Sequence, residues 1–159
     1  PDERREVLHT ARVLLEGAAE LGVPVLATEQ YPKGLGHTVA ELAEQLPDQA
    51  QVIAKDSFSC CGASGFSDAL AATGREQVVI VGMEAHVCVL QTALQLRELG
   101  YAPFVVADGV VSRRVAHRDN ALARLGHAGV VVSNVESVLF EWLGRAGTDS
   151  FKRLAGLIR

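Results

Sequence analysis

Short, strongly apolar runs alternate with helical patterns along the whole chain, and this alternation limits the fold more than any other feature of the sequence. The runs are rich in Val and Ile and occupy residues 23–28, 51–55, 77–81, 102–107 and 129–133. Runs with so few polar positions are typical of strands that are covered on both faces, as in parallel sheets. The sequence therefore predicts an α/β fold with three layers, in which helices cover both faces of a parallel sheet.

Helical patterns fill the segments between these runs. An apolar face with helical spacing covers residues 3–21, and capping-box sequences beginning at Thr38 and Ser133 predict two further helix starts. The remaining helices are expected at residues 68–73, 88–99 and 118–128. Because this order begins with a helix that no strand precedes, we expect the first strand of the sheet to be absent from the chain.

The length and the charge of the chain limit the number of domains and the kinds of ligand that we expect. The chain has 159 residues, which fits a single domain over residues 1–159. It carries 15 basic and 19 acidic residues with no basic stripe, so we expect a small-molecule substrate and no nucleic-acid partner. No apolar run approaches the ~20 residues of a membrane span, and no signal-peptide core is present. We therefore expect a cytoplasmic protein without a membrane partner.

Two residues at the predicted carboxyl ends of strands are candidates for chemistry, because ligands of open α/β sheets bind outside these ends. Lys55 ends the run 51–55, and Cys88 follows the run 77–81 at a predicted helix start, where backbone N–H groups favour a thiolate. The lysine charge can lower the pKa of a nearby thiol or stabilise developing negative charge. The alternatives are a structural thiol in the core and a solvated surface lysine.

Other patterns are less specific. The segment from Thr28 to Gly36 suits either a pocket loop or an ordinary turn. No glycine-rich stretch fits a dinucleotide or ATP loop, and the five histidines lack close ligand spacing, so we expect neither a cofactor nor a metal. The three cysteines show no CxxC spacing, which argues against a disulfide framework. A thiol sensor that uses Cys88, or Cys60 with Cys61, is an alternative function.

Three segments together resemble the isochorismatase-like cysteine hydrolases, a superfamily that includes nicotinamidases and N-carbamoylsarcosine amidases, and especially its isochorismatase domain-containing branch. They are residues 28–36 (TEQYPKGLG), Lys55 with Phe58 and Ser59, and residues 82–88 (GMEAHVC). The resemblance covers nearly the whole chain. It implies the isochorismatase-like hydrolase fold, with a Rossmann-like sheet of about six parallel strands in the order 3-2-1-4-5-6.

The resemblance also implies a metal-independent cysteine hydrolase that cleaves a small amide or related carbonyl compound through a Cys88 thiolate and a covalent intermediate. Lys55 belongs to the family's Asp–Lys–Cys triad, whose aspartate ends the first strand and has no counterpart in the chain. Backbone N–H groups near Glu84 and Cys88 would form the oxyanion hole, and a cis peptide is expected at Met83–Glu84. Residues 28–36 lack the Asp/His metal set of nicotinamidases, which argues against zinc and a nicotinamide substrate.

The predicted substrate pocket includes Thr28, Gln30, Tyr31 and Phe58. A catalytically silent binding or assembly protein is the competing hypothesis, and an aspartate on the absent strand would favour the enzyme. Apolar residues at 130–132, 140, 142 and 143, together with the behaviour of relatives, predict a homo-oligomer. We also expect ~15–25 further N-terminal residues containing a strand that ends in Asp-x-Gln, since a missing central strand would leave two rows of backbone groups unpaired.

Overall fold

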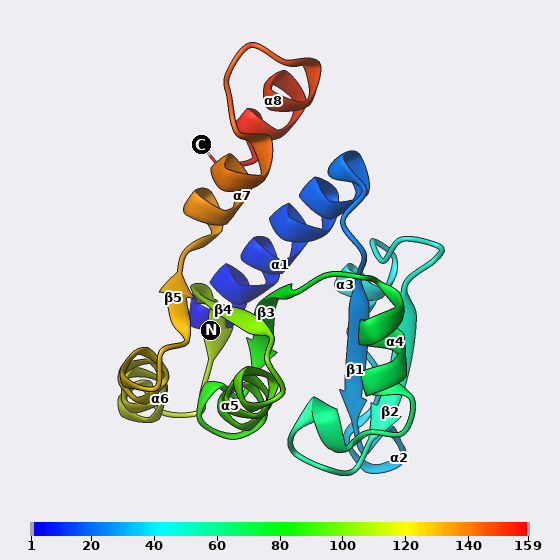
Figure 1. Cartoon of the computed structure of the whole chain (residues 1–159), viewed down its shortest axis with the longest axis vertical. Helices are drawn as coiled ribbons and strands as arrows, with labels where there is room; N and C mark the ends of the chain where they lie inside the picture. Colours follow the sequence, from blue (N-terminus) through cyan, green and yellow to red (C-terminus); the bar gives the residue numbers. More distant parts are fainter. Residues whose placement is uncertain (1, 159) are drawn as a thin grey trace.

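The computed structural model describes residues 2–158, and its strands all pair in parallel (Figure 1). The strands form two separate sheets. The first holds β1 (Leu26–Gln30) and β2 (Gln51–Lys55), and the second holds β3 (Gln77–Met83), β4 (Ala102–Val111) and β5 (Val131–Ser133) in the order β3-β4-β5. The α/β class with parallel strands that was predicted from the alternating runs is confirmed.

Helices cover both faces of the second sheet (Figure 1). One face carries α1 (Asp2–Leu21) and α7 (Val135–Leu143), and the other carries α5 (Leu90–Glu98) and α6 (Val115–His127). The shorter elements are α2 (Pro32–Leu35), α3 (Ala40–Ala43), η1 (Cys60–Gly62), α4 (Phe66–Ala72), η2 (Ala85–Val89), α8 (Asp149–Leu154) and η3 (Ala155–Ile158). The element η2 is a π-helical turn, and it leads directly into α5.

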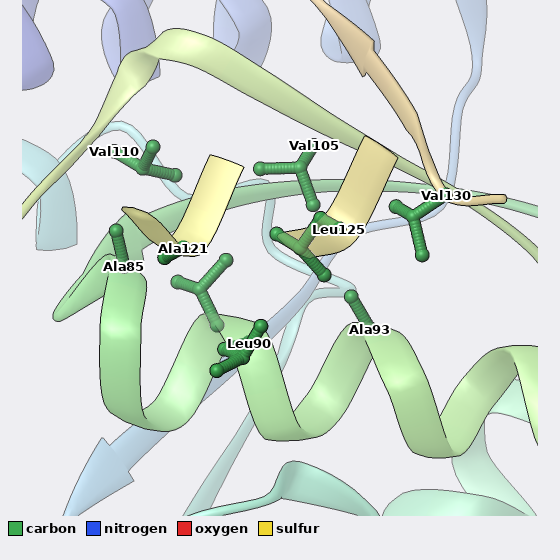
Figure 2. Packing of buried hydrophobic residues seen from close by; sticks show 9 residues of the cluster. Ala85, Leu90, Ala93, Val105, Val110, Ala121, Leu125 and Val130 are labelled. Atoms are coloured by element: carbon green, nitrogen blue, oxygen red, sulfur yellow. The ribbon is translucent and has the colours of Figure 1, made fainter. Parts of the chain in front are cut away.

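Strand β4 lies at the centre of the core. Val105 and Val106 are adjacent in sequence, and both have no exposed surface. Val105 packs against η2, α5 and α6 in a cluster that includes Leu90 and Leu125 (Figure 2), whereas Val106 packs with Leu14 of α1 on the opposite face. Because successive strand residues point to opposite faces, a strand buried between two helical layers needs the continuous apolar run seen in the sequence.

Strands β1 and β3 are each paired on one side only, and they do not pair with each other. All five residues of β1 are partly exposed, as are Val78, Val79, Ile80 and Val81 of β3. The two sheets stand apart in Figure 1, with β1 and β3 as their facing edges. The predicted strand order places one further strand at this position.

Several predicted boundaries are wrong. The strand predicted at 23–28 covers Leu26–Gln30, because Pro24 has no N–H to donate to a ladder. The strand predicted at 129–133 covers only Val131–Ser133. Strands β3 and β4 continue beyond residues 81 and 107, since their pairing resumes at Gly82↔Val110 after a register shift. Gly82 and Gly109 therefore lie in or beside an irregular part of the ladder.

The two predicted capping boxes are also wrong. Val39 is the N-cap of α3, and the Thr38 hydroxyl and N–H donate to Glu29 instead. Helix α7 begins one residue later than predicted, with the Asn134 side chain accepting a hydrogen bond from the Ser137 N–H at 2.8 Å. The helix predicted at 88–99 is the turn η2 followed by α5. The helices predicted at 68–73 and 118–128 begin two and three residues before their predicted starts, at Phe66 and Val115.

None of the helices described for residues 2–158 combines the length and the hydropathy that a membrane-spanning segment requires.

Candidate functional site

The carboxyl end of β2 and the turn η2 bring Lys55 and Cys88 together. The Lys55 Nζ lies 3.7 Å from the Cys88 Sγ, although the two residues are 33 positions apart in sequence. Lys55 is 7% exposed, and Cys88 is half-buried with a free thiol. The sequence placed both residues at one edge of a parallel sheet, and the structure brings their side chains into contact.

Neutral oxygen atoms surround the Lys55 ammonium. It donates hydrogen bonds to the backbone carbonyls of Ser57 at 3.0 Å and Phe58 at 2.8 Å, and to the side-chain oxygen of Gln30. No carboxylate within residues 3–158 forms a salt bridge with it. The ammonium faces the sulfur of Cys88, and a positive charge beside a thiol favours the thiolate.

Gln30, the last residue of β1, contacts both the carboxyl end of β2 and the turn η2. Its Nε2 donates to the Asp56 carbonyl at 2.8 Å, which orients the amide so that Oε1 faces Lys55. The same Oε1 lies 3.7 Å from the Cys88 Sγ. The Gln30 amide is therefore fixed between the ammonium and the thiol.

The backbone before Cys88 turns sharply. The Met83–Glu84 peptide is cis, as the resemblance predicted, and Glu84 precedes the turn η2. The Glu84 carboxylate accepts hydrogen bonds from the Arg113 guanidinium at 2.8 and 3.0 Å and from the Arg113 N–H at 2.9 Å. These bonds to Arg113 lower the pKa of Glu84 to about 2. Arg113 therefore holds the Glu84 carboxylate just before the turn that carries Cys88.

Low pH should weaken the interaction between the Glu84 carboxylate and Arg113. The folded pKa of Glu84 lies below the ordinary value of 4.5, so its contribution to stability is present above pH ~4.5 and is lost as the pH falls toward about 2. We expect Arg113→Gln to lower the Tm by about 2–4 °C at pH 7 and by progressively less below pH ~4.5. Thermal melts of both proteins from pH 7 to the lowest pH at which they fold measure this difference. An equal Tm difference at every pH would contradict it.

The other predicted pocket residues lie at different distances from the thiol. Phe58 is 55% exposed, and its carbonyl accepts from Lys55. Tyr31 is 57% exposed, and its N–H donates to the Lys55 carbonyl at 2.7 Å. Thr28 contacts the Cys60 sulfur at 3.4 Å. Of the four residues, only Gln30 has a side chain within hydrogen-bond distance of the Cys88 sulfur in the described structure.

Sequence reasoning missed three contributors to this site. Arg113 fixes Glu84 from 29 residues away, Ser57 supplies a carbonyl to the lysine, and Glu29 binds the segment that follows Tyr31. No local pattern marks Arg113 or Ser57, because a backbone carbonyl can come from any residue and Arg113 follows a strand end like any surface arginine. Glu29 precedes Gln30, a predicted pocket residue, in the sequence Thr28-Glu29-Gln30. This neighbouring position was the one sequence signal that could have indicated a role for Glu29 at the site.

The described part of the chain, residues 2–158, holds no cluster of three or more His, Cys, Asp or Glu side chains suited to a metal ion.

Comparison with known sequences identifies the family. The profile of the isochorismatase domain matches residues 1–137. Isochorismatase domain-containing protein 1 of Salmo salar is 36% identical over 97% of this chain and 54% of its own length. Isochorismatase domain-containing protein 2 of Danio rerio is 39% identical over 96% of this chain and 76% of its own length. The chain thus spans about half the length of the first relative and three quarters of the second.

Solved structures that resemble this chain support the same family assignment. A structure described as MAR1 ribonuclease from Caenorhabditis elegans is 38% identical, with a TM-score of 0.91 over 97% of this chain and 79% of that one. The YcaC gene product of Escherichia coli, described as an octameric hydrolase of unknown specificity, is 27% identical, with a TM-score of 0.86 over 96% and 76%. YcaC from Pseudomonas aeruginosa, described with covalent acrylamide, is 32% identical, with a TM-score of 0.84 over 99% and 78%. With its fold, its site and these relatives taken together, the chain belongs to the isochorismatase family.

Proposed function

We propose that the protein is a metal-independent cysteine hydrolase that cleaves a small amide or a related carbonyl compound. The observation that carries the proposal is the buried Lys55 ammonium, 3.7 Å from the Cys88 sulfur and without a carboxylate partner in residues 3–158. The description of Pseudomonas aeruginosa YcaC with covalent acrylamide adds support, because acrylamide is an electrophile to which thiolates add.

In the proposed mechanism, the Cys88 thiolate attacks the carbonyl carbon of the substrate and forms a tetrahedral intermediate. The backbone N–H groups of Glu84 and Cys88 donate to its oxygen. Collapse of the intermediate breaks the C–N bond, releases the amine with one proton and leaves a thioester on Cys88. Water then attacks the thioester, which gives the carboxylic acid and restores the thiolate, and the second proton of the water replaces the proton that left with the amine. Lys55 keeps its positive charge and stabilises the anionic sulfur throughout.

We propose further that an aspartate on an additional strand transfers the protons, and that this strand lies between β1 and β3. Both strands are paired on one side only and partly exposed, unlike β4. A parallel strand followed by α1 and then β1 gives the usual right-handed crossover. An acidic residue at the carboxyl end of this strand would also supply the carboxylate that Lys55 lacks. A protein sequence ahead of residue 1 without an apolar run of strand length that ends in an acidic residue would contradict the proposal.

A small-molecule substrate remains our proposal although one solved neighbour is described as a ribonuclease. This chain has a net charge of −4, and among the described residues Lys55 is the one cation within hydrogen-bond distance of the Cys88 sulfur. Binding to a phosphate backbone depends on several Lys or Arg contacts.

The cytoplasmic location also remains a proposal. Three free thiols support it, although a relative from Phytophthora sojae is named a secreted effector.

A substrate screen tests the proposed reaction. Purified protein is incubated with a panel of small primary and secondary amides, and the release of ammonia, amine or acid is measured. We expect turnover of at least one amide by the unmodified protein and none by Cys88→Ala. Single-stranded RNA serves as a further substrate in the same assay. RNA cleavage that survives Cys88→Ala, with no amide turned over, would contradict the proposed function.

We also propose that the protein forms a homo-oligomer, as the octameric Escherichia coli neighbour does. Val131, Val132 and Phe140 have exposed fractions of 47, 40 and 38%. Trp142 and Leu143, which the sequence also suggested, instead pack inside the chain's own C-terminal cluster. Light scattering should give a mass that is a multiple of the chain mass, and Val132→Asp should lower it. A monomer mass at every concentration would refute the proposal.

A further inference from the structure

Glu29 has a nearly buried carboxylate that takes no part in the proposed reaction. It lies next to Gln30 at the end of β1, and its side chain is 10% exposed. The carboxylate accepts hydrogen bonds from the N–H and the hydroxyl of Thr38, both at 2.8 Å, and its second oxygen lies 2.8 Å from the Nδ1 of His37. A buried carboxylate is stable only when hydrogen bonds of this kind replace water. Glu29 therefore fastens the chain eight and nine residues further along.

The segment between these contacts, residues 31–37, is held at both ends. At its start, the Tyr31 N–H donates to the Lys55 carbonyl at 2.7 Å, and Tyr31 has a left-handed backbone with φ of 41°. At its end, His37 and Thr38 are bound to Glu29. A Cβ atom at Gly34 would collide with the Tyr31 ring, so the segment folds back closely on itself. We call residues 31–37 the fastened loop.

The fastened loop begins next to the residue that contacts the thiol. Gln30, which precedes it, contacts both Lys55 and the Cys88 sulfur. Within the loop, Tyr31 is 57% exposed and Leu35 is 73% exposed. Two exposed side chains with large apolar surface therefore lie one and five residues after Gln30, the residue that contacts Lys55 and the Cys88 sulfur.

We infer that Glu29 is a positioning residue, which holds the fastened loop in place as a wall of the Cys88 site so that Tyr31 and Leu35 contact an apolar substituent of the substrate. The inference rests on the proposed function, because it concerns the same site. The bonds from Thr38 and His37 also lower the pKa of Glu29 to about 2, so the carboxylate stays charged at neutral pH. The loop is therefore fastened under the conditions in which the site would work.

Two variants and a matched control test the inference. Glu29→Gln keeps the shape of the side chain but removes its charge, whereas Glu29→Asp keeps the charge. Glu41→Gln makes the same chemical change at an exposed position on α3, where no side-chain hydrogen bond is described for the glutamate. Circular dichroism and Tm first establish that each variant is folded.

The first readout is trypsin cleavage after Lys33, an exposed residue within the fastened loop. Cleavage of a native protein requires local opening, so its rate reports how firmly the loop is held. We expect Glu29→Gln to be cut at least about tenfold faster than the unmodified protein and Glu41→Gln, with Glu29→Asp in between. Equal cleavage rates in all four proteins would overturn the inference.

The second readout is the rate at which two electrophiles label Cys88, measured by peptide mass spectrometry. Chloroacetamide is small, whereas N-benzylchloroacetamide carries an apolar substituent that can reach the loop. We expect Glu29→Gln to slow labelling by the benzyl compound about tenfold while the rate with chloroacetamide changes less than about twofold. Faster labelling by the benzyl compound would mean that the loop obstructs the site, which contradicts its role as a contacting wall.

The two readouts separate this inference from the proposed function. Selective labelling of Cys88 without a change in cleavage overturns the role of Glu29 and leaves the nucleophile in place. Equal labelling of all three cysteines in the unmodified protein overturns the nucleophile, and the wall role with it, whatever the cleavage rates are. Cleavage and benzyl labelling that change together in a Cys88-selective protein support the inference.

Discussion

Cys88→Ala should reduce amide turnover by at least about a thousandfold, because it removes the atom that forms the covalent intermediate. Its effect on stability should be small. The Cys88 sulfur is half-buried, and its side-chain contacts with Lys55 and Gln30 are both long, at 3.7 Å. We therefore expect a Tm within about 3 °C of the unmodified protein. Steady-state kinetics on the best substrate of the screen, together with thermal melts, provide the measurement.

Cys61→Ala is the matched control. Cys61 is also a partly buried free thiol, but it lies in η1 and forms no hydrogen bond with a lysine in the described structure. Burial raises the pKa of the Cys61 thiol, which disfavours the reactive thiolate. This variant should keep turnover within about twofold. Loss of activity in Cys61→Ala, with normal activity in Cys88→Ala, would move the nucleophile to the other thiol.

Lys55→Met is the second change with a large expected effect. Methionine keeps much of the aliphatic stem but removes the charge that faces Cys88, so the thiolate should be less populated at neutral pH. We expect the rate of Cys88 alkylation at pH 7 to fall about tenfold or more. Turnover should fall at least as far, because the anionic sulfur is the attacking group.

The same substitution removes the donor to three oxygens, those of Gln30, Ser57 and Phe58. Each buried acceptor left without a donor costs about 1–3 kcal/mol, so Lys55→Met should also be less stable. Lys55→Arg separates the two effects, since it keeps the charge and should recover part of the alkylation rate. Lys152→Met, at an exposed lysine of α8, is the control. If alkylation of Cys88 is as fast in folded Lys55→Met as in Lys152→Met, the lysine does not activate the thiol.

The sequence predicted the parallel architecture because β4 is buried on both faces, and such burial requires a continuous apolar run. It also predicted that Lys55 and Cys88 meet, because parallel strands bring their carboxyl ends to one edge. The bounds of β2, Gln51–Lys55, were predicted without error. These features depend on periodicity and topology, which a sequence shows directly.

Other features depend on tertiary contacts that no local pattern encodes. Thr38 has the sequence of a helix cap, but the buried carboxylate of Glu29 binds both its N–H and its hydroxyl. The extension of β4 to Val111 depends on pairing beyond a register shift with β3. Arg113 reaches Glu84 only because the end of β4 lies beside the turn η2. In each case, a partner distant in sequence decides the local structure.

The central claim is that Cys88 is the nucleophile, and the most direct measurement is the mass of the protein during turnover. Protein mixed with excess of the best amide substrate is quenched in acid within milliseconds to seconds, and its intact mass and peptides are determined. We predict a transient mass increase equal to the acyl group, carried by the peptide that contains Cys88 and absent from Cys88→Ala. Steady turnover with the acyl group on a peptide containing Cys60 or Cys61, or unchanged turnover by Cys88→Ala, would contradict the claim.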